Sequence, residues 1–181
     1  SVLGPLKFCL YTLPLGAIVR HHGLKFHVYA DDTQLYIAFD HSDPDFALDK
    51  LNACISDIRS WMIKNKLKIN DDKTEFLIIS SPYSRSSIPD CKLCVGTSKI
   101  VRSLSAKNLG VMFDSHVSME SHIGLVCQSL HFHLKNIGAV RHLLTEEATN
   151  QIVHSLISSR LDYCNSLMFG LPDSLIQRLQ R

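Results

Sequence analysis

Two adjacent carboxylates, Asp31 and Asp32, are the side chains of this sequence best suited to chemistry. They stand between two runs rich in β-branched and aromatic residues, 26–30 and 33–39, and this pattern predicts a β-hairpin with the acidic pair at its tip. Like charges held so close repel each other, so the site favours divalent cations that neutralise them. Paired Mg²⁺ ions held by carboxylates carry out in-line phosphoryl transfer on nucleotides.

The pair also has a purely structural interpretation, because Asp is common in turns, where it tolerates the left-handed region and hydrogen-bonds its own backbone. The charges that follow it bear on the choice. Residues 31–58 contain seven Asp and a single Lys, and a basic cluster comes next, made of Arg59, Lys64, Lys66, Lys68 and Lys73. A basic patch beside a metal site suits a phosphate backbone, but basic residues at a helix end also favour the helix dipole, and both interpretations stay open.

The stretch FHVYADDTQLYIAF, residues 26–39, resembles the signature strand–turn–strand of reverse transcriptases. More narrowly, it is similar to that of non-LTR retrotransposons of the long interspersed element type. Further segments resemble the same family in the family's own order: residues 1–6 the end of its Gln-Gly-Ser-x-Leu-Gly-Pro segment, residues 61–75 its helix-to-strand segment, residues 108–114 the strand that grips the primer end, and residues 159–165 its thumb. The resemblance covers essentially the whole chain.

This resemblance implies that Asp31 and Asp32 are catalytic residues and ligands of two Mg²⁺ ions, together with a third Asp that the family carries upstream. The ions would activate the primer 3′-hydroxyl and neutralise the triphosphate. Lys73 is a candidate catalytic proton donor to the leaving pyrophosphate. Its alternative role is a surface charge next to Asp71 and Asp72.

The resemblance also implies partners, namely an RNA template, a DNA primer and deoxynucleoside triphosphates, with no membrane and no specific protein partner. The complete enzyme would work in a nuclear or cytoplasmic ribonucleoprotein. The residues expected to contact nucleic acid lie in the template segment, on the hairpin, in the basic cluster and in the primer-grip strand: Gly4, Tyr29, Lys66, Lys68, Leu109 and Gly110. Tyr29 would also support the hairpin, and Gly110 would allow close approach of the backbone.

Hydrophobic periodicity predicts the elements that position these residues. A helix should start at Ser42-Asp43-Pro44 and run to about Lys64, with an apolar face formed by Leu48, Leu51, Ile55, Ile58 and Met62. Another helix should end at Gly138, with a face formed by Met119, Ile123, Val126, Leu130, Leu134 and Ile137. Thr145 should cap the next helix. The other predicted elements are a helix over 3–13 ended by Pro14, a connector or short turn over 16–23, strands over 75–80 and 109–113, a loop over 82–89 and a hairpin over 91–102.

These elements predict an α+β fold. Residues 1–114 should form a partial reverse transcriptase palm, an antiparallel sheet with packed helices, and residues 115–181 a helical thumb-like region. The helix over 44–64 should pack on the opposite face of the sheet that carries the acidic pair.

Composition limits other functions. With 19 basic and 17 acidic residues, the net charge is too small to identify a partner. The apolar stretch 2–19 is broken by Lys7, two prolines and Gly16, so it is neither a signal peptide nor a membrane span. Cys91 and Cys94 have the spacing of zinc ligands, but no second Cys or His pair follows them, and their alternating surroundings favour a strand.

No initiator Met opens the chain, and the family's fingers, endonuclease and first catalytic Asp have no counterpart in it. We therefore expect a fragment of an RNA-directed DNA polymerase that is inactive alone and binds Mg²⁺ weakly or not at all. The alternative is a catalytically inactive remnant that at most binds nucleic acid without sequence preference.

Overall fold

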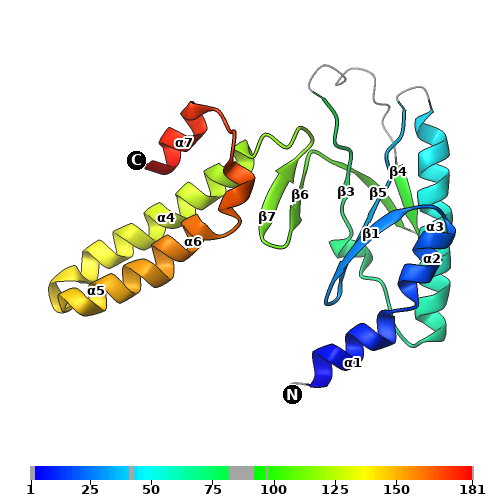
Figure 1. The fold of residues 1–181 in the computed structure, drawn as a ribbon, viewed down its shortest axis with the longest axis horizontal. Coiled ribbons are helices and arrows are strands. Elements are labelled where there is room, and N and C mark those ends of the chain that lie inside the picture. Colours follow the sequence, from blue (N-terminus) through cyan, green and yellow to red (C-terminus); the bar gives the residue numbers. More distant parts are fainter. Residues whose placement is uncertain (1–2, 41–42, 82–91, 97, 181) are drawn as a thin grey trace. The chain divides into compact units, whose positions relative to one another are not determined.

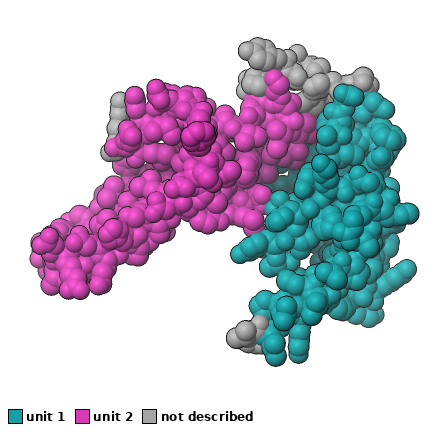
Figure 2. Space-filling model, in the orientation of Figure 1, with its two compact units in different colours: residues 1–76, 82–103 teal, residues 77–81, 104–181 magenta. Residues whose placement is uncertain are grey.

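The computed structural model describes residues 3–40, 43–81, 92–96 and 98–180. They have the predicted α+β fold, which divides into two compact units (Figure 2). The first unit is formed by residues 1–76 and 82–103, and the second by residues 77–81 and 104–181. The predicted loop over 82–89 and Cys91 lie outside the described residues.

Figure 1 labels most of the helices and strands. Up to Ser103 they are α1 (Leu3–Thr12), α2 (Leu15–His21), β1 (Lys25–Tyr29), β2 (Asp32–Tyr36), α3 (Pro44–Lys64), a 3₁₀ turn (Asp71–Lys73), β3 (Phe76–Leu77), β4 (Lys92–Val95) and β5 (Ser98–Ser103). From Ser105 they are β6 (Ser105–Asn108), β7 (Val111–Asp114), α4 (Glu120–Val140), a 3₁₀ turn (Arg141–Leu143), α5 (Glu146–Val153), a π-helical turn (His154–Ser158), α6 (Ser159–Asp162), a 3₁₀ turn (Asn165–Met168) and α7 (Asp173–Gln180).

Helix α3 follows the sequence prediction at both ends. Asp43 caps it, since its Oδ1 accepts a hydrogen bond from the backbone N–H of Phe46 at 3.2 Å, and Pro44 occupies the first helical position. Its buried residues are Ala47, Cys54, Ile55 and Ile58. Of the predicted face, Ile55 and Ile58 are buried, and the other members are half-buried.

The core of the first unit lies between α2, α3 and the β1–β2 hairpin. Its buried residues are Leu15, Val19, Leu24, Cys54 and Ile58. Phe26 and Leu35, paired across the hairpin, pack against it, and so does Trp61. Burial and, after it, the charge of Asp57 raise the pKa of the Cys54 thiol to about 11, so this thiol stays protonated and packs as an apolar group.

Helix α2 corrects the sequence prediction, which was wrong in expecting a connector or a short turn over 16–23. Pro14 ends α1 and also precedes α2, because its φ of −60° already suits a helix. Gly16 then permits close packing: a Cβ at this position would lie 2.7 Å from the ring of Phe26. The glycine that suggested a break instead brings the helix close to the hairpin.

Three small sheets form the β-structure, with strand orders β1-β2, β3-β5-β4 and β6-β7. The hairpin predicted over 91–102 is confirmed where it is described, with Val95 opposite Ser98. The strand predicted over 75–80 was too long, since only Phe76 and Leu77 belong to the sheet. The reason is that the chain then changes partner: the N–H of Ser80 donates to the carbonyl of Ser115 at 2.9 Å.

The second unit is mainly helical. Along α4 the predicted face is buried at Ile123, Leu130 and Ile137, but Leu134 is exposed. The helix passes Gly138 and ends only at Val140, so Gly138 is not its stop. Thr145 caps α5 as predicted, its Oγ1 accepting from the N–H of Ala148 at 3.2 Å. No helix in the described part of the chain is long and apolar enough to cross a membrane.

Candidate functional site

The acidic pair lies at the tip of the β1–β2 hairpin, as predicted (Figure 1). Tyr29 pairs with Asp32 as the last pair of the ladder, so Ala30 and Asp31 form a two-residue turn. Ala30 has a φ of +54°, which a residue with a Cβ rarely adopts. Such strained positions cluster at functional sites, where the surrounding structure holds them.

Both carboxylates are exposed, and so is Tyr29, with a relative accessibility of 61%. Within the described ranges, neither Asp31 nor Asp32 has a hydrogen bond or an ion pair with another side chain. The base of the hairpin is fixed, because Phe26 and Leu35 pack on the core of the first unit. The hairpin therefore presents two uncommitted carboxylates on an anchored support.

The donor set fits a magnesium ion in part. Carboxylate oxygens are the ligands Mg²⁺ prefers, and it is commonly bound by one or two carboxylates together with substrate phosphates. Asp31 and Asp32 supply two such groups from adjacent positions. Across the residues that the structure describes, no group of three or more His, Cys, Asp or Glu side chains could hold a metal. The pair can thus form part of a two-metal site but lacks a third protein ligand here.

Arg59 leaves the basic cluster that the sequence suggested. Its Nη1 lies 3.1 Å from Oδ1 of Asp71, and Oδ2 of the same carboxylate accepts from the hydroxyl of Ser98 at 3.3 Å. The guanidinium covers Gly96, since a Cβ there would lie 2.4 Å from its Cζ. Arg59 therefore ties α3 to the 3₁₀ turn and to the β4–β5 hairpin. The remaining members of the cluster are exposed: Lys64, Lys66, Lys68 and Lys73.

Lys73 lies on the 3₁₀ turn Asp71–Lys73, which the Arg59–Asp71 ion pair holds in place. No hydrogen bond or ion pair among the described residues joins Lys73 to Asp31 or Asp32. The structure therefore brings the acidic pair and Tyr29 together on one hairpin. Lys73 belongs to the same unit but to a separate turn.

The other predicted contacts lie on different elements. Gly4 is exposed on α1. Leu109 and Gly110 belong to the second unit, where they form the turn between β6 and β7. The strand predicted over 109–113 was therefore wrong at its start, which is Val111, because both turn residues have positive φ and cannot continue a strand.

Sequence reasoning missed the role of Asp114. Its carboxylate accepts hydrogen bonds from the N–H groups of His116, Ser118 and Met119 at 2.9–3.1 Å, and from the Ser118 hydroxyl at 2.8 Å. Burial alone would raise the pKa of this carboxyl, but the hydrogen bonds outweigh it and hold the pKa below its ordinary value of 3.8. Asp114 therefore organises the turn that leads into α4. An Asp preceding a helical pattern is the signal that could have revealed it.

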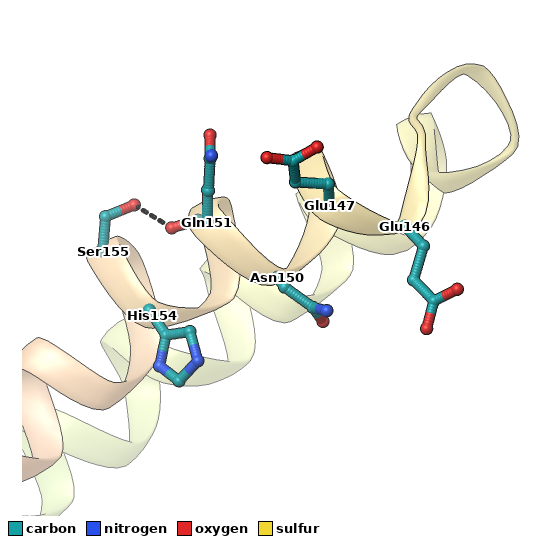
Figure 3. A pocket seen from close by; sticks show the side chains of 6 residues that line it. All are labelled: Glu146, Glu147, Asn150, Gln151, His154 and Ser155. Carbon is teal, nitrogen blue, oxygen red and sulfur yellow. Dashed lines mark hydrogen bonds between the residues drawn. The ribbon is translucent and has the colours of Figure 1, made fainter.

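An open pocket lies elsewhere, along α5 and the π-helical turn (Figure 3). Its lining residues are Glu146, Glu147, Asn150, Gln151, His154 and Ser155. The Ser155 hydroxyl is engaged with the carbonyl of Gln151 at 2.9 Å, the contact drawn in Figure 3. None of these residues belongs to the acidic hairpin. We therefore base the candidate site on the hairpin, where charge and strain coincide.

Comparison with known families bears on this site. Residues 1–113 match the family model described as reverse transcriptase (RNA-dependent DNA polymerase). The match spans more than half of the chain and includes both the acidic hairpin and the Leu109–Gly110 turn. No curated protein and no solved structure matches the chain.

Proposed function

The chain belongs to the reverse transcriptase family, and from this we propose that it is the palm and thumb portion of an RNA-directed DNA polymerase of a non-LTR retrotransposon. The observation that carries the proposal is the exposed Asp31–Asp32 pair on the tip of a hairpin whose base is anchored in the core. The non-LTR assignment rests on the resemblance of several sequence segments to that group, from residues 1–6 to residues 159–165.

We assign the palm to residues 1–114 and a thumb-like region to residues 115–181. The assignment follows the order of the matching motifs along the chain. It is compatible with a helical second unit, although the compact units divide after Ser103 and bring the β6–β7 hairpin together with the helices.

In this proposal Asp31 and Asp32 bind the catalytic magnesium. When bound, Mg²⁺ activates the primer 3′-hydroxyl and neutralises charge on the triphosphate. The carboxylates suit this role because they are exposed and uncommitted. Tyr29, beside them at the end of the ladder, supports the tip and contacts the primer–template backbone.

We assign the remaining site residues to contacts with the nucleic acid or to proton transfer. Lys66 and Lys68, both exposed, contact phosphates, and Gly4 lies beside the template and the incoming nucleotide. The Leu109–Gly110 turn grips the primer end through its backbone. Lys73 donates a proton to pyrophosphate. This last role requires Lys73 to reach a substrate bound at the hairpin.

Two carboxylates do not hold two metal ions in catalytic register, so we propose that activity needs a third carboxylate from a segment outside residues 1–181. We expect purified residues 1–181 to show no nucleotide incorporation. The decisive test compares primer extension by this chain with extension by a longer polypeptide, in which a reverse transcriptase segment carrying fingers and the first catalytic Asp is joined to Ser1.

Only the longer polypeptide should extend the primer in Mg²⁺. In it, Asp31→Asn should abolish extension and leave primer–template binding within about twofold, because affinity comes mainly from phosphate contacts and rate from metal-borne charge stabilisation. Incorporation by residues 1–181 alone would contradict the need for a third carboxylate. If Asp31→Asn lost binding and extension together, the carboxylate would be structural. If the longer polypeptide never extended a primer, the chain would be an inactive remnant.

A further inference from the structure

The turn between β6 and β7 is strained in a way its sequence does not explain. Leu109 has a φ of +46° and Gly110 a φ of +86°. A two-residue hairpin turn with positive φ at both positions normally carries Asn-Gly or Asp-Gly. Leucine is ill suited to the first position, because its Cβ crowds the backbone in the left-handed region. Such a conformation persists only where the surrounding structure holds it.

Tyr163 makes the contact that holds it. Its hydroxyl donates a hydrogen bond to the carbonyl oxygen of Leu109 at 2.5 Å, from a position 54 residues further along the chain. Its ring lies against Gly110, where an added Cβ would stand 3.3 Å from Cε1. A glycine at this position therefore does two things: it accepts a positive φ and leaves room for the tyrosine ring.

The tyrosine is itself held on a bend. It follows the last residue of α6, and the next residue, Cys164, has a φ of +54°. The helix thus stops where Tyr163 leaves it, and the left-handed Cys164 turns the chain into the 3₁₀ turn Asn165–Met168. Both partners of the Tyr163–Leu109 hydrogen bond therefore lie at or next to a residue with a strained, positive φ, Leu109 itself and Cys164.

The same hairpin is also tied to α4. One residue pair away from the pair that closes the turn, the N–H of Met112 donates to Nδ1 of His122 at 3.4 Å, and at the base Asp114 accepts the hydrogen bonds that shape the entry to that helix. The hairpin is thus held at its base by the turn around Asp114, along β7 by His122 of α4, and at its tip by Tyr163. All of these residues belong to the second unit.

From these contacts we infer that Tyr163 is a positioning residue for the primer grip: it fixes the Leu109–Gly110 turn in the shape that meets the primer end. The inference rests on the proposed function of that turn. It predicts that the primer grip is carried by the helical unit and set by a hydroxyl–carbonyl hydrogen bond, not by the sequence of the turn.

The test uses the whole chain with Tyr163→Phe, which removes the hydroxyl and keeps the ring. Tyr11→Phe is a matched control, because the Tyr11 hydroxyl also donates to a backbone carbonyl 54 residues away, that of Asn65 at 2.7 Å. The two residues are similarly exposed, with relative accessibilities of 51% for Tyr163 and 47% for Tyr11. Thermal melting and circular dichroism verify that both variants fold.

Two measurements separate the contact from its function. Amide hydrogen exchange across residues 105–114 reports whether the turn is held. The ratio of affinities for an RNA–DNA hybrid with a recessed primer 3′ end and for a blunt hybrid of equal length reports the grip on the primer end. A merely structural tyrosine would not change this ratio in a folded protein.

We expect Tyr163→Phe to speed exchange in the turn about two- to tenfold, the effect of losing one hydrogen bond, and to lower the preference for the recessed hybrid several-fold. Tyr11→Phe should change neither quantity. If amide exchange in Tyr163→Phe kept its wild-type rate, the positioning role of Tyr163 would be overturned, but not the function proposed for the turn. Faster exchange with an unchanged preference would overturn positioning. A wild-type chain that shows no preference for the recessed end would overturn the function proposed for the turn.

Discussion

At the scale of single residues, the ion-pair partner of each basic side chain separates structural charges from candidate phosphate-binding ones, which charge alone does not. Arg59 and Lys66 follow the same acidic stretch, yet Arg59 is paired with Asp71 whereas Lys66 is exposed. Lys66 also occupies a left-handed position, with a φ of +57°, just after α3. A basic side chain free of an ion pair can exchange its counterions for a phosphate. The lysines following α3 are therefore better candidates than Arg59 for contact with a nucleic-acid backbone.

Replacing Lys66 and Lys68 by Ala should weaken primer–template binding and reduce its salt dependence. Each lysine that contacts a phosphate contributes about 1 to the slope of log affinity against log salt, so the slope should fall by about 2. Titrations at several salt concentrations measure it. The control pair Lys50→Ala and Lys92→Ala removes the same charge elsewhere in the first unit. An equal effect of both pairs would indicate net charge and not local contact.

At the scale of elements, short hairpins depend on what anchors them. An isolated two-stranded hairpin is marginally stable in water. The β1–β2 hairpin is anchored by Phe26 and Leu35, which pack against the core, and the residues at its tip are exposed. The β6–β7 hairpin is anchored by the turn around Asp114 and by Tyr163. The two hairpins thus present their tips differently, the first with exposed carboxylates and the second with a fixed backbone.

Asp114→Ala should destabilise the second unit by about 1–2 kcal/mol, because it removes the acceptor of several hydrogen bonds. The substitution leaves the N–H groups of His116, Ser118 and Met119 without their acceptor. Urea denaturation followed by circular dichroism measures the change. Asp162→Ala, an exposed carboxylate of the same unit, is the control and should change the unfolding free energy by less than about 0.5 kcal/mol. Equal losses would contradict the role of Asp114 in holding this turn.

His122 should make the second unit less stable in mild acid. Burial lowers the pKa of this side chain below its ordinary value of 6.5, and its Nδ1 accepts from Met112. The unfolded chain takes up a proton below pH 6.5, whereas the folded chain does so only at its lower pKa. Stability is therefore complete above 6.5 and is lost as the pH falls toward the folded-state pKa.

Urea midpoints between about pH 7.5 and pH 5 measure this loss. His122→Gln keeps an acceptor for Met112 but cannot be protonated, so it should flatten the dependence. His131→Gln, on the exposed side of the same helix, should retain it. If the urea midpoint of His122→Gln changed with pH as much as that of the wild type, another group would be responsible for the pH dependence.

At the scale of the whole molecule, each unit leaves apolar surface exposed. In the first, three leucines of α1 and the leucine that follows it are exposed, with relative accessibilities of 58–71%: Leu3, Leu6, Leu10 and Leu13. Lys7, on the same helix, is also exposed, so its charge is solvated. Contiguous exposed apolar patches favour association in solution.

We expect the chain to bind a hydrophobic dye and to self-associate with rising concentration. Replacing Leu6 and Leu10 by Lys should lower both the dye fluorescence and the sedimentation coefficient at high concentration, without lowering the melting temperature. Ala17→Lys, which adds charge at an exposed position of α2, controls for charge alone. A wild-type chain that stays monomeric and binds no dye would show that this surface is harmless.

The sequence by itself determined the features that depend on neighbouring residues. Asp43 and Pro44 start α3, Thr145 caps α5, and alternation around the acidic pair forms its hairpin, because capping and strand alternation are local interactions. The match to the reverse transcriptase family rests on the same linear information.

Tertiary structure decided the rest. It shortened β3, placed Leu109 in a turn, paired Arg59 with Asp71 and brought Tyr163 to the Leu109 carbonyl. Each of these outcomes depends on a partner between 12 and 54 residues away. Local propensity cannot anticipate such a partner, because a carbonyl or a guanidinium gains its hydrogen bond only after the intervening chain has folded.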